Sequence, residues 1–207
     1  MFSYLIAGIT FAFAAAVQPG PLQTYIISQT MKKGWRATLP AAFAPVLSDI
    51  PILALVLFLL SAMPDTFIII LRLAGGLFLL YLAYSAFKTW RQFDADKTAA
   101  DESGRQTLFK AVFVNLLNPA PYLGWSLIMG PIFLKGWNIA PSNGIALIAG
   151  FYVTMVLTLI GLIMLFGFAR RLGPQVSKIM IGLSALLLLA FGLYQLWVGV
   201  NSLFSLF

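Results

Sequence analysis

The sequence predicts an all-α membrane protein of six transmembrane helices, built as two inverted three-helix repeats. Its 207 residues are 61% hydrophobic and only 9% charged, whereas about a quarter of the residues in soluble domains carry a charge. The mean hydropathy of +0.95 agrees with this, and a proline-rich motif occurs once in each half. So few charges cannot cover the core of a water-soluble domain of this length.

Six apolar segments are long enough to cross a bilayer, which requires roughly 20 residues. They comprise residues 4–31, 37–63, 66–86, 108–134, 144–168 and 179–200. The first segment follows Met1-Phe2-Ser3, which contains no basic residue, and it is longer than the apolar core of a signal peptide. We therefore expect it to be a retained helix.

Basic residues predict how the helices are oriented. Of the 13 basic residues, all but Arg72 and Lys135 lie in loops on one side of the predicted bundle. These residues are Lys32, Lys33, Arg36, Lys88, Arg91, Lys97, Arg105, Lys110, Arg170, Arg171 and Lys178. Loops rich in Lys and Arg remain in the cytoplasm, so both termini are expected outside. The net charge of +7 is explained in the same way, without a nucleic-acid partner.

Two sequence motifs recur between the halves. Gln18-Pro19-Gly20-Pro21 in the first segment matches Asn118-Pro119-Ala120-Pro121 in the fourth, and Lys33-Gly34-Trp35 matches Lys135-Gly136-Trp137. The predicted repeats are residues 1–92 and 108–207, joined by a polar cytoplasmic linker at 93–107. Each repeat crosses the membrane an odd number of times, so the second must be inverted, as in many secondary transporters. The alternative is two unrelated helices kinked by proline.

The paired prolines predict a break inside each of these two helices. Proline cannot donate a backbone hydrogen bond, so the carbonyls of Ala15 and Val17, and in the fourth helix those of Asn115 and Leu117, lose their helical partners. An unsatisfied carbonyl in hydrocarbon costs several kcal/mol. Breaks at matching positions of two repeats indicate a binding site between them, although a structural kink is the alternative.

Two charged residues stand out within the predicted helices. Asp49 lies near the middle of the second helix, where a carboxylate is expensive and usually functional; we expect it to bind a substrate ammonium group, to exchange the coupled proton, or both. The alternative is a structural hydrogen bond to a neighbouring helix. Arg72, in the third helix, is expected either to pair with Asp49 or bind a carboxylate, or to extend toward the outer headgroups.

The two breaks and the two charged residues together define one set of candidate substrate-binding or coupling residues. The set comprises Gln18, Pro19, Gly20, Pro21, Asp49, Arg72, Asn115, Asn118, Pro119 and Pro121. Enzyme chemistry is not expected, because the chain has no Cys, no His and no phosphate-binding loop. Neither a cofactor nor a metal site is predicted. The tryptophans Trp90, Trp125, Trp137 and Trp197 are expected to include interface anchors, and no chemistry is assigned to them.

Several of these motifs resemble the LysE/RhtB amino-acid exporter family. The resemblance lies in Gln18-Pro19-Gly20-Pro21, the basic turn Lys32-Lys33-Gly34-Trp35-Arg36, the stretch from Leu73 to Tyr84, and Asn115-Leu116-Leu117-Asn118-Pro119. It implies six helices, inverted repeats and export driven by the proton-motive force, and Asp49 stands where that family often has an aspartate in the membrane. The chain departs from the family pattern at Gln18, at Ala120-Pro121 and at the prolines of the second helix, so its substrate need not be lysine, threonine or homoserine.

The predicted function is secondary active export of amino acids or related small zwitterionic solutes, coupled to protons, by alternating access at the paired breaks. The alternatives are a passive channel or cation permease, and a membrane scaffold that transports nothing. The expected partners are the amino-acid-like solute, protons and membrane lipid, and the question of a homo-oligomer stays open. The expected location is a plasma membrane of bacterial type (inner membrane), with a multi-pass topology.

Overall fold

The computed structural model describes residues 1–58, 65–93 and 103–204, and within them the chain forms helices and no strands. The longest helices are α5 (Asp65–Arg91), α9 (Pro141–Ala169) and α10 (Pro174–Phe204). They contain the predicted third, fifth and sixth segments. Part of the predicted linker and the end of the predicted second segment fall outside the described residues.

The first predicted segment is a broken helix, as the prolines predict. Helix α1 (Phe2–Val17) ends at Gln18, which is extended, and α2 (Pro21–Lys33) begins one residue after the extended Gly20. The two helices are bent by 60° relative to each other. Pro21 stands at the first position of α2, where its fixed φ suits a helix and its missing N–H is no loss.

The second segment changes helix type near its start. It runs from the short helix α3 (Trp35–Thr38) through the 3-10 helix η1 (Leu39–Phe43) into α4 (Ala44–Phe58). Pro40 lies in η1 and Pro51 inside α4. The turn before α3 is made by Gly34, whose φ of 86° is readily adopted only by glycine.

The fourth predicted segment is divided more finely than the sequence predicts. Helix α6 (Gly104–Leu116) ends before Asn118, and α7 (Pro119–Gly124), the π-helical turn η2 (Trp125–Met129) and α8 (Gly130–Ile139) follow. Helix α6 starts inside the predicted linker, with Ser103 as its N-cap. Helix α8 continues through Lys135-Gly136-Trp137, so this motif does not form the turn that Lys33-Gly34-Trp35 makes. The 3-10 turn η3 (Arg170–Leu172) connects α9 to α10.

The described helices support a multi-pass membrane protein. Four of them, or stretches of consecutive helices, are long and apolar enough to cross a membrane, and the bent α1–α2 pair raises this number to five. The predicted segment 108–134 is not among them, because the break at Asn118 divides it. Six crossings in two inverted repeats therefore stay a prediction.

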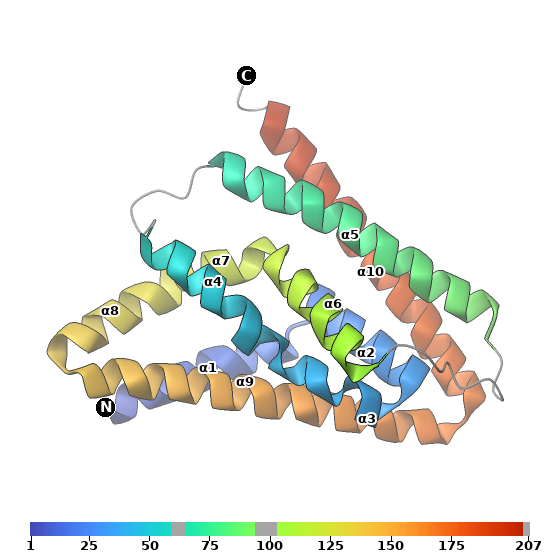
Figure 1. The fold of residues 1–207 in the computed structure, drawn as a ribbon, viewed down its shortest axis with the longest axis horizontal. Helices are drawn as coiled ribbons and strands as arrows, with labels where there is room; N and C mark the ends of the chain where they lie inside the picture. Colours follow the sequence, from blue (N-terminus) through green and yellow to red (C-terminus); the bar gives the residue numbers. More distant parts are fainter. Residues whose placement is uncertain (59–64, 94–102, 205–207) are drawn as a thin grey trace.

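Two long helix pairs enclose the remaining helices. Helix α5 packs along α10, and α1 packs along α9. In Figure 1 these pairs diverge from the end where α9 meets α10, with α2, α4, α6 and α7 between them. Helix α2 contacts α10, α9, α6 and α5, which places it at the centre of the molecule.

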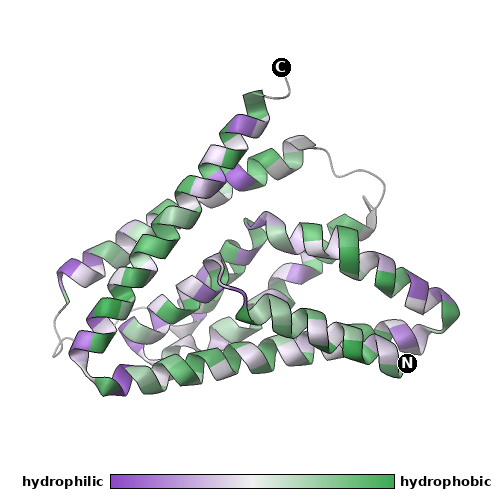
Figure 2. Ribbon diagram, turned by 180° about the vertical axis from the view of Figure 1, so that it is seen from behind, coloured by the Kyte–Doolittle hydropathy of each residue, from purple (hydrophilic) through white to green (hydrophobic). Residues whose placement is uncertain are grey.

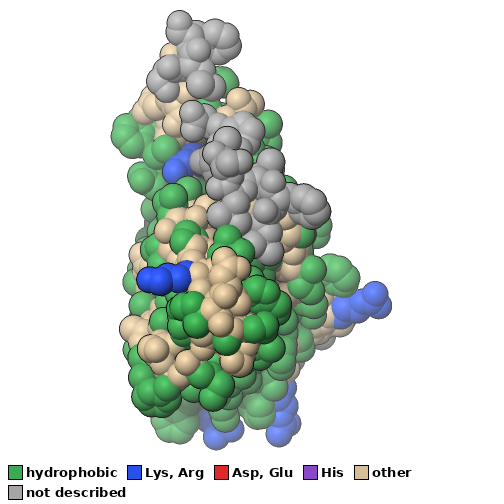
Figure 3. All heavy atoms as spheres, turned by 90° about the vertical axis from the view of Figure 1, so that its left-hand side faces the viewer, with side chains coloured by type: hydrophobic (Ala, Val, Ile, Leu, Met, Phe, Trp, Pro, Cys, Tyr) green, Lys and Arg blue, Asp and Glu red, His purple; other side chains and the backbone are tan. Residues whose placement is uncertain are grey.

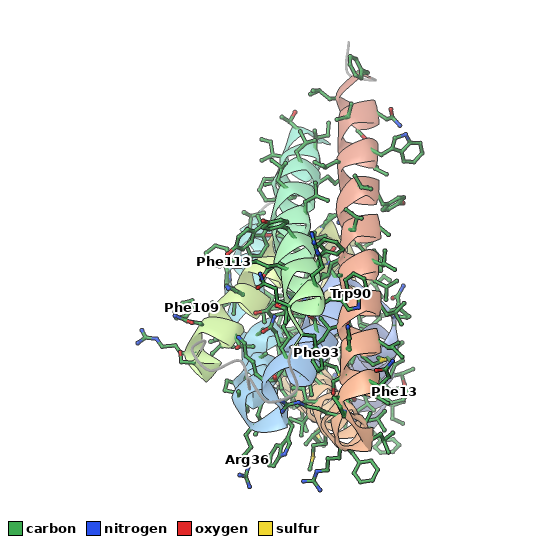
Figure 4. The ribbon with its side chains drawn as sticks, turned by 90° about the vertical axis from the view of Figure 1, so that its right-hand side faces the viewer. Phe13, Arg36, Trp90, Phe93, Phe109 and Phe113 are labelled. Carbon is green, nitrogen blue, oxygen red and sulfur yellow. The ribbon has the colours of Figure 1, made fainter. Side chains whose placement is uncertain are left out.

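Apolar side chains cover the outer surface of these helices. Figure 2 shows hydrophobic residues along most of α9 and α10, and Figure 3 shows a mainly hydrophobic face at the side of α8. Phe109 and Phe113 on α6 are both more than half exposed, and Figure 4 shows Phe109 pointing away from the bundle. A surface of this kind suits contact with lipid.

The described basic loops lie at one end of the molecule. The α2–α3 turn, the α9–α10 turn and the end of α5 lie toward the same end in Figure 1, and the start of α1 and the last described turn of α10 lie away from it. Arg36 points outward at this end, where its guanidinium lies 5.1 Å from the Trp35 ring. We refer to this region as the basic end.

Candidate functional site

A cavity of about 480 Å³ lies between the α1–α9 pair and the α5–α10 pair. Every site residue predicted from the sequence lines it. These residues are Gln18, Pro19, Gly20, Pro21, Asp49, Arg72, Asn115, Asn118, Pro119 and Pro121. The two helix breaks thus face one space, together with the two charged residues predicted within the membrane.

Asp49 is held on one wall of this cavity by neutral donors. It is only 3% exposed. Its Oδ2 accepts hydrogen bonds from Trp125 Nε1 at 3.1 Å and from Tyr152 Oη at 3.2 Å, and its Oδ1 accepts one from Asn115 Nδ2 at 3.3 Å. In the described part of the chain no cation pairs with this carboxylate. The site therefore orients a buried carboxyl group through neutral donors alone, among the described residues.

Further contacts fix the donors around Asp49. Asn115 Nδ2 also donates to Ser48 Oγ at 2.7 Å, and Ser48 donates to the carbonyl of Ala44. The rings of Trp125 and Tyr152 stack with their centroids 6.3 Å apart. One carboxylate thus receives contacts from helices α4, α6 and α9 and the turn η2. Because the polar groups of this cluster hydrogen-bond to one another, the cluster is tolerated in an apolar interior.

Arg72 interacts with Gln195 rather than with Asp49. Its Nη1 donates to Gln195 Oε1 at 3.4 Å, which joins α5 to α10. No ion pair between Arg72 and Asp49 is present among the described residues, although both line the cavity. Arg72 therefore keeps donor capacity for a second group, since a guanidinium carries five N–H donors.

Two of the four carbonyls predicted to be freed at the breaks, those of Ala15 and Asn115, find partners within the protein. Gln23 Nε2 donates to the carbonyls of Ala15 at 3.1 Å and Ala16 at 3.2 Å, which ties α2 back onto α1. At the second break, Tyr122 Oη donates to the Leu116 carbonyl at 2.9 Å and the Asn118 N–H donates to the Asn115 carbonyl at 3.2 Å. Protein groups thus occupy the carbonyls of Ala15, Ala16, Asn115 and Leu116 at the two breaks.

Asn118 explains how the second break forms. It is extended, and its Oδ1 accepts a hydrogen bond from the Ala120 N–H at 3.1 Å, which makes it the N-cap of α7. Pro119 follows at the first helical position. An Asn-Pro pair thus ends one helix and starts the next, because Asn is a preferred N-cap and proline is favoured directly after it.

The close approach of α5 to this break gives a testable prediction. A Cβ added at Gly75 would collide with the Leu117 carbonyl oxygen, so Gly75→Ala should destabilise the protein by about 1–3 kcal/mol through overpacking. We expect a lower thermal unfolding midpoint in detergent. Gly161→Ala is the matched control, because a Cβ there meets nothing within 4 Å. Equal midpoints for the two variants would contradict this account of the break.

Four residues of the site were missed in the sequence analysis: Ser48, Trp125, Tyr152 and Gln195. The sequence analysis gives Trp125 no chemistry, whereas in the structure this residue is only 2% exposed and donates a hydrogen bond to Asp49. The sequence does contain one signal for this role, because Trp125 lies about one helical turn after Pro121 of the second break. Tyr152 and Gln195 are contributed by distant helices, and no local pattern identifies them.

The cavity contains no evident metal site. Asp49 is the only carboxylate in its lining, and no group of three His, Cys, Asp or Glu side chains lies together in the described part of the chain. The remaining walls are mainly apolar and aromatic, with Phe11, Phe151, Met155 and Phe191 among them. The arrangement suits a small organic solute with one or two polar ends.

Comparison with known proteins identifies the family. The family model of the LysE type translocators matches residues 13–199, which is most of the chain. No curated protein and no solved structure matches the chain. The matched region includes both helix breaks, Asp49 and Arg72. The chain therefore belongs to the LysE type translocator family, a transporter family and not an enzymatic one, whose solutes are generally amino acids or related molecules.

Proposed function

We propose that this protein is a proton-coupled secondary exporter of amino acids or related small zwitterionic solutes. The observation that supports this most is that both broken helices line one cavity together with Asp49 and Arg72. Among the described residues, Asp49 is buried without a cationic partner, and Arg72 binds only a neutral amide. Family membership supports a transporter of such solutes.

The charges of the cavity suit a zwitterion. In this proposal Asp49 binds the ammonium group and Arg72 binds the carboxylate of the solute. The cavity offers one acidic and one basic side chain, so a solute with a second positive charge would lack a partner there. Its apolar and aromatic walls favour an aliphatic or aromatic side chain. We therefore infer neutral amino acids rather than lysine.

Proton coupling is assigned to Asp49. Ionisable residues inside a membrane commonly form proton relays, and this one lacks a permanent cationic partner among the described residues. A proton and a solute ammonium group would then compete for the same oxygen atoms. Because only one of them can occupy Asp49 at a time, such competition would exchange a proton for a solute across the membrane.

The packing supports alternating access between two inverted repeats. Helix α1 packs on α9 of the other half, and α6 packs on α4 and η1 of the first half. We infer that residues 1–92 and 108–207 form the two repeats, joined by 93–107, and that one rocks against the other around the cavity. The basic end would face the cytoplasm of a bacterial-type inner membrane, with both termini outside.

Counterflow in proteoliposomes tests this proposal. Vesicles loaded with an unlabelled neutral amino acid should accumulate the labelled solute transiently, and uptake should saturate with concentration. Vesicles without protein are the control. A conductance that does not saturate in a planar bilayer would instead favour a channel, and the absence of both activities with a panel of amino acids would favour a scaffold.

A further inference from the structure

Helix α2 is buried on nearly all sides between the cavity and the basic end, although one of its faces is polar. Thr24, Tyr25, Ser28, Gln29 and Lys32 are all buried. With 3.6 residues per turn they occupy an arc of about 140°, which runs from the cavity end of the helix to the basic end. A polar arc of this length is not needed to pack a central helix.

Two of these side chains each have a polar atom without a hydrogen-bond partner. Within the described part of the chain, Ser28 Oγ and Gln29 Oε1 are both buried without one, in residues that are 1% and 6% exposed. Thr30, on the opposite face of the same turn, donates to the Ile26 carbonyl at 2.8 Å. Buried polar groups are almost always paired. The two exceptions are consecutive residues on the polar arc, and both need a partner from outside the protein, such as water or a solute.

The basic end of α2 is held closed by neighbouring loops. Arg170 Nη2 donates to the Lys32 carbonyl at 3.4 Å, which satisfies the C-terminal end of α2 with a cation. Trp35 packs against Gly167 of α9, and α2 itself contacts α10. Arg170, Trp35 and Gly167 lie outside the cavity lining, although α2 and α10 both contribute residues to it.

On this polar arc, Tyr25 Oη donates to the Thr107 carbonyl of α6 at 3.4 Å. We propose that the polar face of α2 lines the inner half of the solute pathway, which is closed in this structure and opens when α2 separates from α6. Ser28 and Gln29 then contact water and the passing solute, which supplies the missing partners. This inference rests on the proposed carrier function. It assigns the inner gate to the contacts of Tyr25 with the Thr107 carbonyl of α6 and of Arg170 with the Lys32 carbonyl.

Single cysteines in this naturally Cys-free chain test the inference. Ser28→Cys and, independently, Gln29→Cys are treated in proteoliposomes with a positively charged methanethiosulfonate on the side of the basic loops. Because labelling reports the open population, we expect both to react roughly tenfold faster than the control, and faster still during counterflow. Thr30→Cys is the matched control, being equally buried and on the opposite face of α2.

The outcomes separate the gate from the carrier function. Counterflow by the wild-type protein with no labelling at either position, or with labelling no faster than at Thr30→Cys, would overturn the gate and leave the carrier intact. Labelling without any counterflow would overturn the proposed carrier, while the pathway through α2 would still be open to water. If Ser28→Cys does not fold, Gln29→Cys provides the same comparison.

Discussion

Replacing Asp49 by asparagine is expected to abolish proton-driven transport while the protein stays folded. The asparagine oxygen can accept the hydrogen bonds that Trp125 and Tyr152 donate to Oδ2, and Asn115 can rotate its amide to face the new NH₂ group. We therefore expect the free energy of unfolding to change little. The negative charge that would bind either a proton or an ammonium group is lost completely.

Solute flux driven by a pH gradient in proteoliposomes measures this effect. The unfolding midpoint of the variant in detergent provides the folding control, and Asp49→Glu, which keeps the carboxylate, should retain part of the flux. Undiminished, gradient-dependent flux with Asp49→Asn would remove Asp49 from coupling. Loss of gradient-driven flux with intact counterflow would assign it to the proton alone.

Arg72→Gln should weaken the binding of solutes that carry a carboxylate. A hydrogen bond to a charged group contributes about 1.5–3 kcal/mol, so the apparent KM should rise roughly 10- to 100-fold. The shorter, neutral amide of the variant still offers an N–H donor toward Gln195, which limits the damage to the α5–α10 contact seen in the wild-type protein. The rise in KM should be confined to solutes that carry a carboxylate.

A pair of solutes tests this specificity. The KM of an amino acid should rise in the variant, whereas inhibition by the corresponding amine, which lacks the carboxylate, should stay the same. Arg72→Lys keeps the charge and should be intermediate, because it loses the planar pair of donors. An equal effect on both solutes would show that Arg72 only supports the fold, through Gln195.

The sequence predicted the features that depend on local chemistry. The paired prolines identified both helix breaks, and the membrane location of Asp49 and Arg72 identified two charged residues of the cavity lining. Helical structure throughout the described chain also followed from composition. These predictions succeeded because proline geometry and the energetics of buried charge act whatever the tertiary context.

Features that depend on tertiary contacts could not be predicted. Gln23 reaches back to Ala15 and Ala16 only because the chain bends by 60° between α1 and α2. Tyr152 reaches Asp49 from a helix about one hundred residues away. The two Lys-Gly-Trp motifs differ in structure because Arg170 packs at Gly34, whereas Gly136 lies inside α8 against Tyr4.

Access to Ala120, in the lining of the cavity, tests the central claim most directly. A cysteine at this position should react with a polar thiol reagent applied to either side of the membrane, and a saturating amino acid should slow both reactions. Leu157→Cys, at an exposed apolar position on α9, should stay unreactive. Reaction from one side only, at a rate that the solute does not change, would contradict a cavity that opens alternately to the two sides.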